Sequence, residues 1–381
     1  MASELALLFL RGTVPPDYGG RLARLRWRRA FASDTTAEAA PQELASETFS
    51  QAQRWLVVRE ENALPLPGAA LREPGPGRVL VALGVTPSPP PIHTVRELEE
   101  NARALAPVAP DRTGPVAAPA LFFRVADLPP DAGETVGAYI ARLAGPATPR
   151  ESHPRFAALA LPDPYAHVRP EVTRHLPEGM RRLLDVGCGA GAASGAVKDR
   201  VPELVVIGIE RDAGAAERAR GRLDRVHCGD AAEVLGQLLH GAERFDAFLF
   251  ADVLEHLEDP IGALTLAHRL AAAGATLVAS VPNAGHLSLV RDLMLGRFDP
   301  VPAGLADAGH LRWFTKRSLA EFLEEAGWRP LSIEPIPGAP APDAEEFLSF
   351  FDGWGGADLK SLSTYQWLAV ATAMESDLHE L

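Results

Sequence analysis

The stretch that most narrows the folds open to this chain is residues 182–191, RLLDVGCGAG. An apolar run around Leu184 carries one acid, Asp185, and then breaks into alternating glycines followed by small residues at helical spacing. This order predicts a buried parallel strand, a tight turn and a helix N-terminus. Glycine in such a turn lets a ligand lie against bare backbone, and the N–H groups at a helix start favour electron-rich ligand atoms.

The glycine spacing leaves two classes of cofactor open. Gly187, Gly189 and Gly191 are spaced G-x-G-x-G. The dinucleotide fingerprint is G-x-G-x-x-G and tolerates alanine at its third position, which here is Ala192. With Asp185 two residues before the first glycine, the stretch also resembles the first motif of class I S-adenosylmethionine-dependent methyltransferases. The turn alone does not separate the two classes.

Length, charge and cysteine content limit the other classes. The 381 residues suffice for two domains, and the net charge of −13 argues against broad nucleic-acid binding. The two cysteines, Cys188 and Cys228, lie in or beside predicted cofactor loops, so we expect no disulfide framework. The apolar run at 5–10 is too short for a membrane span and lacks the basic start of a signal peptide. We expect a cytoplasmic protein that binds neither nucleic acid nor membrane.

The second half of the chain alternates between strand and helix patterns. Strands are predicted at 183–186, 204–209, 225–228, 245–251 and 275–281, and helices at 192–200, 213–223, 231–240 and 259–271. Such alternation implies a parallel sheet covered by helices on both faces. Ligands of such sheets bind at the carboxyl ends of the strands.

Acidic residues fall at the ends of successive predicted strands. Glu210 ends the second strand, 19 residues after Gly191, where its carboxylate could accept hydrogen bonds from both ribose hydroxyls of an adenosine. Asp230, after the third strand, could meet the adenine amino group. Asp252, after the fourth, would lie near a reacting methyl group. Dinucleotide enzymes share only the first of these acids, so the repeated pattern favours the methyl-donor interpretation.

Three later motifs support the same interpretation. They are V-L-E-H-L-E-D-P at 253–260, S-V-P-N at 280–283 and G-H-L-R-W-F-T at 309–315. Together they resemble the branch of class I methyltransferases that carries E-H-L after strand four and D-x-x-H-L-R-x-F-T in a late loop. The loop residues that match are Asp307, His310, Leu311, Arg312, Phe314 and Thr315. With a predicted last strand at 365–372, the resemblance covers about 165–373.

The resemblance implies an α/β fold, with a Rossmann-like, seven-stranded, doubly wound sheet. It also implies S-adenosyl-L-methionine as cofactor and methylation of a hydroxyl on a small acceptor, either a sugar or a natural product. The predicted cofactor-binding residues are Asp185, Gly187, Cys188, Gly189, Gly191, Glu210, Arg211, Asp230, Ala231, Asp252 and Val253. The predicted substrate-binding residues are Tyr165, Arg169, His286, Arg312 and Trp313. Tyr165 and Arg169 are expected on one face of a helix over 165–175.

Methyl transfer to a hydroxyl requires removal of a proton, for which histidine is the natural base near neutral pH. We predict His256, His310 and Asp252 as catalytic residues. Loop ordering is the alternative role for His256, lid packing for His310 and helix capping for His286. No metal site is expected, although Asp252, Glu255 and His256 are ligand types that could hold a divalent ion. A lid is predicted at 296–315.

The first part of the chain is harder to interpret. We predict a smaller α/β accessory domain at 1–144, a linker at 145–163 and the methyltransferase domain at 164–381. The middle of the accessory domain is faintly similar to family-2 glycosyltransferases, with Glu60-Glu61-Asn62 in place of their D-x-D cluster. Because the aspartates are absent, a degenerate domain that serves substrate docking or homodimer formation is favoured over an active one.

The leading hypothesis is therefore an O-methyltransferase that transfers the methyl group in line, with a histidine general base. An N-methyltransferase acting on an amine remains open, because an amine needs no strong base. A non-catalytic, cofactor-binding scaffold protein is the alternative from another class.

Overall fold

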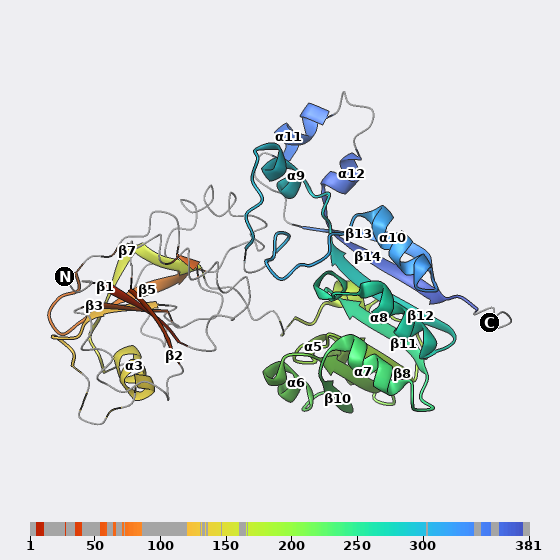
Figure 1. The fold of residues 1–381 in the computed structure, drawn as a ribbon, viewed down its shortest axis with the longest axis horizontal. Helices are drawn as coiled ribbons and strands as arrows, with labels where there is room; N and C mark the ends of the chain where they lie inside the picture. The colour runs from red at the N-terminus through yellow and green to blue at the C-terminus, as the bar shows by residue number, and fades with distance from the viewer. Residues whose placement is uncertain are drawn as a thin grey trace. The chain divides into compact units, whose positions relative to one another are not determined.

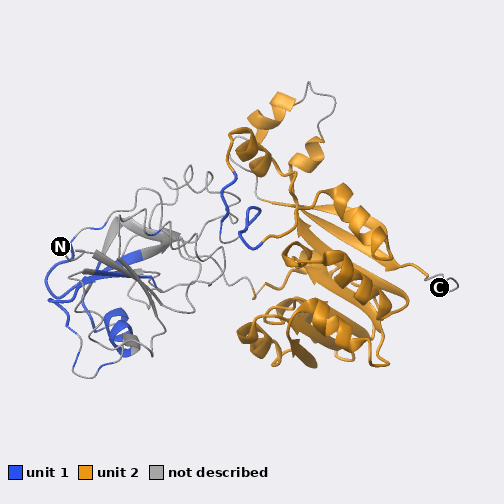
Figure 2. Ribbon diagram, in the orientation of Figure 1, with its two compact units in different colours: residues 1–162, 298–309 blue, residues 163–297, 310–381 orange. Residues whose placement is uncertain are grey.

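The structure is a computed structural model, and it describes part of the chain. The described residues are 5–10, 27, 35–39, 54–58, 64–65, 71, 73–85, 120–129, 131, 134, 136–145, 147–159, 165, 167–301, 304–338, 344–351 and 358–375. The chain divides into two compact units, residues 1–162 with 298–309 and residues 163–297 with 310–381 (Figure 2). Among the described helices, none combines the length and the apolar character needed to span a membrane.

The first unit is built on a mixed sheet. Its strands are β1 (Leu5–Leu10), β2 (Thr35–Ala39), β3 (Arg54–Val58), β4 (Leu64–Pro65), β5 (Val79–Val85), β6 (Ala120–Arg124) and β7 (Arg150–Leu159), in the order β2-β1-β3-β6-β5-β7-β4. Helix α3 (Val136–Ala144) packs Tyr139 and Leu143 against Trp55 and Phe123. The segment 145–163, expected to be a linker, contains β7, which pairs with β5 in this sheet. The pairing satisfies backbone N–H and C=O groups that the edge of β5 would otherwise leave without partners.

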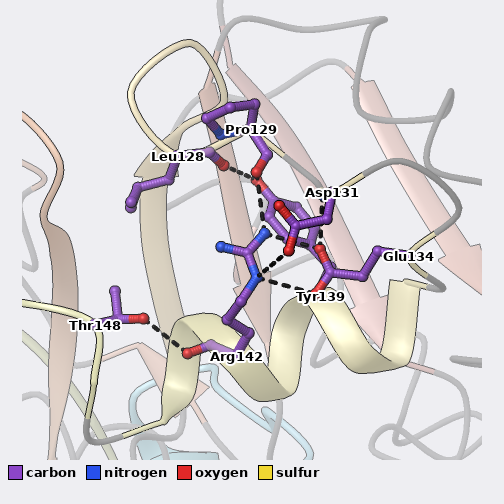
Figure 3. Close-up of polar contacts among 7 residues, drawn as sticks. All are labelled: Leu128, Pro129, Asp131, Glu134, Tyr139, Arg142 and Thr148. Atoms are coloured by element: carbon purple, nitrogen blue, oxygen red, sulfur yellow. Dashed lines mark hydrogen bonds and ion pairs between the residues drawn. The ribbon is translucent and has the colours of Figure 1, made fainter.

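Helix α3 is fastened to its own preceding loop by a local polar cluster (Figure 3). The Arg142 guanidinium donates to both carboxylate oxygens of Glu134, at 3.0 and 2.8 Å. Tyr139 donates its hydroxyl to the Leu128 carbonyl at 2.6 Å. At the C-terminal end of the helix, the Thr148 hydroxyl donates to the Arg142 carbonyl at 2.8 Å. All these partners lie within about twenty residues of chain, so the cluster stabilises a local element.

Several predictions fall outside the described residues. They include the acidic cluster Glu60-Glu61-Asn62, on which the glycosyltransferase resemblance depends. The predicted strands at 79–85 and 121–123 do appear, as β5 and β6.

The second unit contains the sheet that the sequence predicted. Its strands are β8 (Arg182–Val186), β9 (Val205–Glu210), β10 (Arg225–Cys228), β11 (Phe245–Ala251), β12 (Ala271–Pro282), β13 (Trp328–Pro337) and β14 (Thr364–Ala373). The order is β10-β9-β8-β11-β12-β14-β13 (Figure 1). The first five strands run parallel, and β14 runs antiparallel to both β12 and β13. The Rossmann-like, seven-stranded fold is thereby confirmed.

Helices cover both faces of this sheet, because neighbouring strand residues point to opposite sides. Leu184 and Val186 join one core with α7 (Ala231–Leu238), α8 (Pro260–Arg269) and α10 (Lys316–Glu325). Leu183 joins the opposite core with α4 (Pro170–Thr173), α5 (Ala192–Arg200) and α6 (Ala213–Ala219). The sheet is therefore doubly wound.

The insertion before β14 packs against the segment after β12. Helices α9 (Leu287–Met294), α11 (Ala344–Phe351) and α12 (Leu359–Leu362) share a small apolar core, and Figure 1 draws them as one group. Buried Asn283 fastens the group to the sheet by donating its Nδ2 hydrogens to the carbonyls of Ser361 and Thr364, at 2.7 and 2.8 Å.

The helix predicted at 165–175 is wrong. Only the single turn α4 forms, after Arg169 in the left-handed conformation with φ of 52°. Pro170 accounts for the break, because the residue before a proline is disfavoured in the right-handed helical region. Tyr165 and Arg169 therefore do not share a helix face.

Candidate functional site

The glycine turn after β8 is shaped to keep side chains out. Gly187, Gly189 and Gly191 have φ of 73°, 54° and 71°, a region that favours glycine. A Cβ on Gly187 would lie 2.3 Å from Val253 Cγ2, and one on Gly189 would lie 3.1 Å from the Tyr165 carbonyl oxygen. Substitution would thus meet both backbone strain and steric overlap. The turn is a close-approach surface bordered by Tyr165 and Val253.

The turn's N–H groups are used within the protein, which differs from the expectation that they face a ligand. Those of Gly187 and Cys188 donate to the Ile209 carbonyl, at 2.8 and 3.0 Å. The N–H of Gly189 donates to Glu210 Oε2 at 2.9 Å, and that of Ala190 to the Tyr165 carbonyl at 3.0 Å. The second strand end therefore holds the turn in place. The sequence did not predict this network, because the residues that accept these hydrogen bonds are distant from the turn along the chain. They are Tyr165, Ile209 and Glu210.

Asp185 lies at the end of β8 as an acid inside the core. It is 2% exposed, and its Oδ2 atom has no hydrogen-bond partner in the structure. Burial raises the pKa of Asp185 to about 7, and the negative charge of Glu210 adds to the rise. A buried carboxylate oxygen without a partner is costly unless a ligand supplies a hydrogen. Because Asp185 Oδ2 has no partner, the turn suits a cofactor that offers a positively charged group or an N–H donor.

Glu210 at the end of β9 is preorganised by backbone donors. Its side chain is 7% exposed, Oε2 accepts from Gly189 N, and Oε1 accepts from Asp212 N at 2.7 Å. A carboxylate has about four lone-pair sites, so two remain for a diol. The binding of ribose hydroxyls by Glu210 stays a prediction.

The remaining predicted cofactor residues have varied surroundings. Asp230 is exposed and caps α7, with Oδ1 accepting from the N–H groups of the second and third helix residues, at 2.9 and 3.2 Å. Ala231 is buried as the first residue of α7, and Arg211 is exposed. Cys188 is buried and packs in the core, whereas Cys228 is exposed. Neither cysteine forms a disulfide.

Asp252 and Arg169 meet at the ends of β11 and β12. Arg169 Nη1 and Asp252 Oδ2 form an ion pair. Asp252 Oδ1 accepts from Ser280 Oγ at 2.8 Å and from Gln366 Nε2 at 2.9 Å, and Gln366 Oε1 accepts from Arg169 at 3.0 Å. Both oxygens of the Asp252 carboxylate are thus engaged. The catalytic role of Asp252 stays a prediction, and the hydrogen bonds and the ion pair show that its carboxylate also holds neighbouring side chains in place.

Sequence reasoning missed Gln366 as a member of this network. It is a buried polar residue in an otherwise apolar strand, β14, which pairs with β12 so that Gln366 lies opposite Pro282. The polar interruption within TYQWLAVA is a signal that could have found it. Its partner Asp252 lies 114 residues away in sequence, so the pairing itself required the fold.

The E-H-L segment and the late loop come together beside β11. Glu255 and His256 lie in the short helix η3 (Leu254–His256), and His310 lies in the late loop. The imidazole rings of His256 and His310 meet edge to face, with centroids 4.9 Å apart. One potential ligand atom from each of Glu255, His256 and His310 lies within 4.8 Å of the others. The structure therefore brings the two predicted base candidates together.

Main-chain bonds tie the late loop to this position. The N–H groups of Leu311 and Arg312 both donate to the Glu255 carbonyl, at 2.8 and 3.0 Å. Phe314 is buried against Phe322, whereas Trp313 is 38% exposed and lies against His310 with ring centroids 5.6 Å apart. The Arg312 side chain donates to the Glu258 carbonyl. The loop thus leaves Trp313 at the surface and uses Phe314 for packing.

His286, predicted to bind substrate, is a helix cap in the structure. It is buried at the N-terminus of α9, and its Nδ1 accepts from the Ser288 N–H at 3.2 Å. Burial lowers the pKa of His286 to about 4, so the ring stays neutral and able to accept. This is the capping role that the sequence left open as the alternative.

Comparison with known proteins bears on most of the second unit. Residues 136–333 match a family described as "Methyltransferase domain". Among curated relatives, a ubiquinone biosynthesis O-methyltransferase of Pseudomonas aeruginosa is 33% identical over 110 residues, which is 27% of this chain and 45% of that protein. One from Cereibacter sphaeroides is 28% identical over 167 residues, or 42% and 65% of the two chains. The match thus spans less than two thirds of these relatives' length.

Solved structures with a similar fold include S-adenosylmethionine-dependent methyltransferases from two organisms. The one from Archaeoglobus fulgidus is 20% identical with a TM-score of 0.38, covering 51% of this chain and 87% of its own. The one from Aquifex aeolicus is 16% identical with a TM-score of 0.36, covering 56% and 94%. Because the matched methyltransferase domain spans more than half of its 381 residues, this chain belongs to the class I S-adenosylmethionine-dependent methyltransferases.

Proposed function

We propose that this methyltransferase acts on a hydroxyl group of a small acceptor, a sugar or another natural product. The observation that carries the proposal is the contact between His256 and His310 next to the carboxyl end of β11. Two imidazoles beside the strand ends supply a base where an alcohol must lose its proton. An amine acceptor would need no such pair. The names of the curated relatives described above, both ubiquinone biosynthesis O-methyltransferases, support the same choice.

The cofactor cradle follows from the strand-end acids. S-adenosylmethionine supplies, when bound, a methyl group activated on a positively charged sulfur. We assign Asp185 Oδ2 to the amino group of its methionine part, since this buried oxygen needs a hydrogen-bond donor. Glu210 would accept from the ribose hydroxyls, and Gly187 to Gly191 would give the close approach. Asp230, Ala231 and Arg211 would border the adenine.

The acceptor side is assigned to the other half of the strand edge. The ion pair of Arg169 with Asp252 orders the ends of β11, β12 and β14, so we place it as a positioning pair for the acceptor. Exposed Trp313 and the neighbouring Arg312 would cover the acceptor from the late loop. His256 and His310 would receive the proton of the hydroxyl.

A turnover assay tests the proposal. Release of S-adenosylhomocysteine is measured with panels of hydroxylated sugars, phenols and matched amines, and the product is located by mass spectrometry and NMR. We expect turnover with a hydroxylated panel and a loss of at least about tenfold in kcat for His256→Ala and His310→Ala. Turnover confined to amines would establish an N-methyltransferase. Cofactor binding without any turnover across the panels would favour a scaffold protein.

We further propose that residues 1–144 form an accessory domain, joined through 145–163 to a catalytic domain at 164–381, and that the accessory domain supports acceptor docking or homodimer formation. Light scattering of the purified full chain measures the assembly. A monomer at all concentrations would remove the dimer role and leave docking.

A further inference from the structure

Three side chains from two loops form a cluster that the proposed chemistry uses only in part. Glu255 and His256 come from η3, and His310 comes from the late loop. One carboxylate oxygen and one ring nitrogen from each histidine all lie within 4.8 Å of one another. Of the residues that the structure describes, this is the one group of three such side chains placed so closely.

The cluster is held by the main chain. The Glu255 carbonyl accepts from the N–H groups of Leu311 and Arg312, which immediately follow His310. The backbone of one ligand residue therefore fixes the segment that carries another. Such supporting contacts keep a set of ligands in register without using the ligand side chains themselves.

Burial and charge point to a cation. Glu255 is 1% exposed, and the attraction between a carboxylate and a cation is stronger away from water. The two neighbouring imidazoles are both partly exposed, so a site formed by the three residues would open to solvent on the histidine side. Two histidines and one glutamate are the protein ligands of a common class of catalytic zinc site, which leaves one position for water or substrate.

The distances allow an ion after a small closure. Two ligand atoms that each lie about 2.1 Å from a tetrahedral zinc ion are about 3.4 Å apart. The separations here are within 4.8 Å, so a pair of ligand atoms has to close by up to about 1.4 Å, and that movement would come from the partly exposed histidine rings. We propose that Glu255, His256 and His310 bind one divalent transition-metal ion of the zinc class, with an open position for an acceptor oxygen.

The role of this ion in catalysis rests on the proposed function, although its binding does not. The bound ion would lower the pKa of an acceptor hydroxyl that occupies the open position. The imidazoles would then act as ligands, and the hydroxyl proton would pass to solvent water. The histidines would have the same position but a different task from that of a general base.

The test measures metal binding alone. Full-length, untagged protein is stripped with a chelator and titrated with Zn²⁺ by calorimetry and with Co²⁺ by visible absorption, without cofactor or acceptor. We expect one equivalent bound at micromolar or tighter Kd, and weakening of at least about tenfold in each of Glu255→Gln, His256→Ala and His310→Ala. His240→Ala is the matched control, because His240 is an exposed histidine after α7 and should leave the Kd unchanged.

Two outcomes would overturn the site: no saturable binding to the wild-type protein, or equal binding in the His256 and His310 variants. Calorimetry with S-adenosylmethionine, run on the same samples, shows that each variant is folded. A methylation assay with and without chelator separates the metal proposal from the proposed methyltransferase function. Methylation at an unchanged rate in chelator, with no metal bound, removes the catalytic role of the ion and leaves the methyltransferase function standing. Metal binding without methylation of any hydroxylated acceptor would support the metal site and contradict the proposed O-methyltransferase function.

Discussion

Each unit of the molecule contains an arginine paired with a carboxylate, and the two pairs differ in reach. Arg142 and Glu134 in the first unit are eight residues apart, and they close a helix onto its own loop (Figure 3). Arg169 and Asp252 in the second unit are 83 residues apart, and they join the ends of separate strands. The first pair can form as soon as its local segment folds. The second exists only when the whole sheet is assembled.

The backbone shows the same difference. Arg169 and Asp252 have φ of 52° and 57°, and among the described residues they are the only non-glycine positions in the left-handed region. Such strain persists where the surroundings over-determine it, and it gathers at functional sites. The two strained residues also form an ion pair with each other. This strand edge is therefore a candidate functional site on the evidence of its backbone as well. The pair in the first unit has no comparable backbone strain.

The largest effect is expected at the glycine turn of the strand edge. Gly189→Arg should lower affinity for S-adenosylmethionine by at least about 100-fold, because a Cβ there already lies 3.1 Å from the Tyr165 carbonyl oxygen and the side chain would fill the cradle. Calorimetry measures the loss. Gly274→Arg is the matched control, since Gly274 has φ of 72° and no atom within 4 Å of its Cβ. Equal losses in both would assign the effect to backbone strain alone.

Arg169→Ala tests whether the long-range pair serves activity. We expect kcat/KM to fall by about 10- to 100-fold, because Asp252 loses its charged partner and the ends of β11 and β14 lose their order. Arg169→Lys should recover only part of the loss, since it lacks the planar fork that contacts several partners. Steady-state kinetics on the active acceptor measures both. Unchanged kinetics in Arg169→Ala would make the pair purely structural.

Asp185 predicts a pH dependence for cofactor binding. Burial raises its pKa to about 7, so its ionised form is lost as pH falls below that value. Affinity for S-adenosylmethionine should weaken by up to about tenfold per pH unit between pH 7 and 5.5, if the ionised oxygen accepts from the cofactor. Asp185→Asn should flatten this dependence. A steep profile in that variant would move the titrating group elsewhere.

His286 predicts a smaller, purely structural pH effect. Its folded pKa is lowered to about 4 by burial, so the unfolded chain binds the proton more readily and stability falls as pH drops from about 6.5 towards 4. His286→Asn should keep the cap of α9 and lose that pH dependence, whereas His286→Ala should cost about 1 kcal/mol. Hydrogen exchange of the α9 amides as a function of pH measures both. Altered acceptor KM in His286→Asn would instead give this residue a role in binding.

The smallest effect is expected at the local pair. Arg142→Ala should destabilise α3 by about 1 kcal/mol at neutral pH and leave methylation unchanged. The hydrogen bond from Arg142 lowers the pKa of Glu134, so its contribution should vanish as pH falls through that lowered pKa. Hydrogen exchange of the α3 amides measures the loss. A fall in activity would show that the first unit takes part in catalysis.

The sequence predicted the fold of the second unit because its signals are periodic and local. The strands 183–186 and 225–228 and the acids that follow the strands could be assigned from apolar runs and turn residues. Conformations set by rare backbone angles could not. Arg169 was placed on a helix, although the proline after it gave a warning, and the engagement of Asp252 by Gln366 depends on an antiparallel pairing across 114 residues. Pairings of that kind leave no local pattern to read.

The attachment of the late loop has a consequence for how acceptor preference can change. The loop is held through the Glu255 carbonyl by two main-chain N–H groups, and the side chains of Leu311 and Trp313, 48% and 38% exposed, take no part in that attachment. Any residue except proline can supply the same N–H at position 311. The side chains at 311 and 313 can therefore be exchanged while the main-chain attachment stays intact, so the acceptor contact proposed for Trp313 can change without loss of the loop's position.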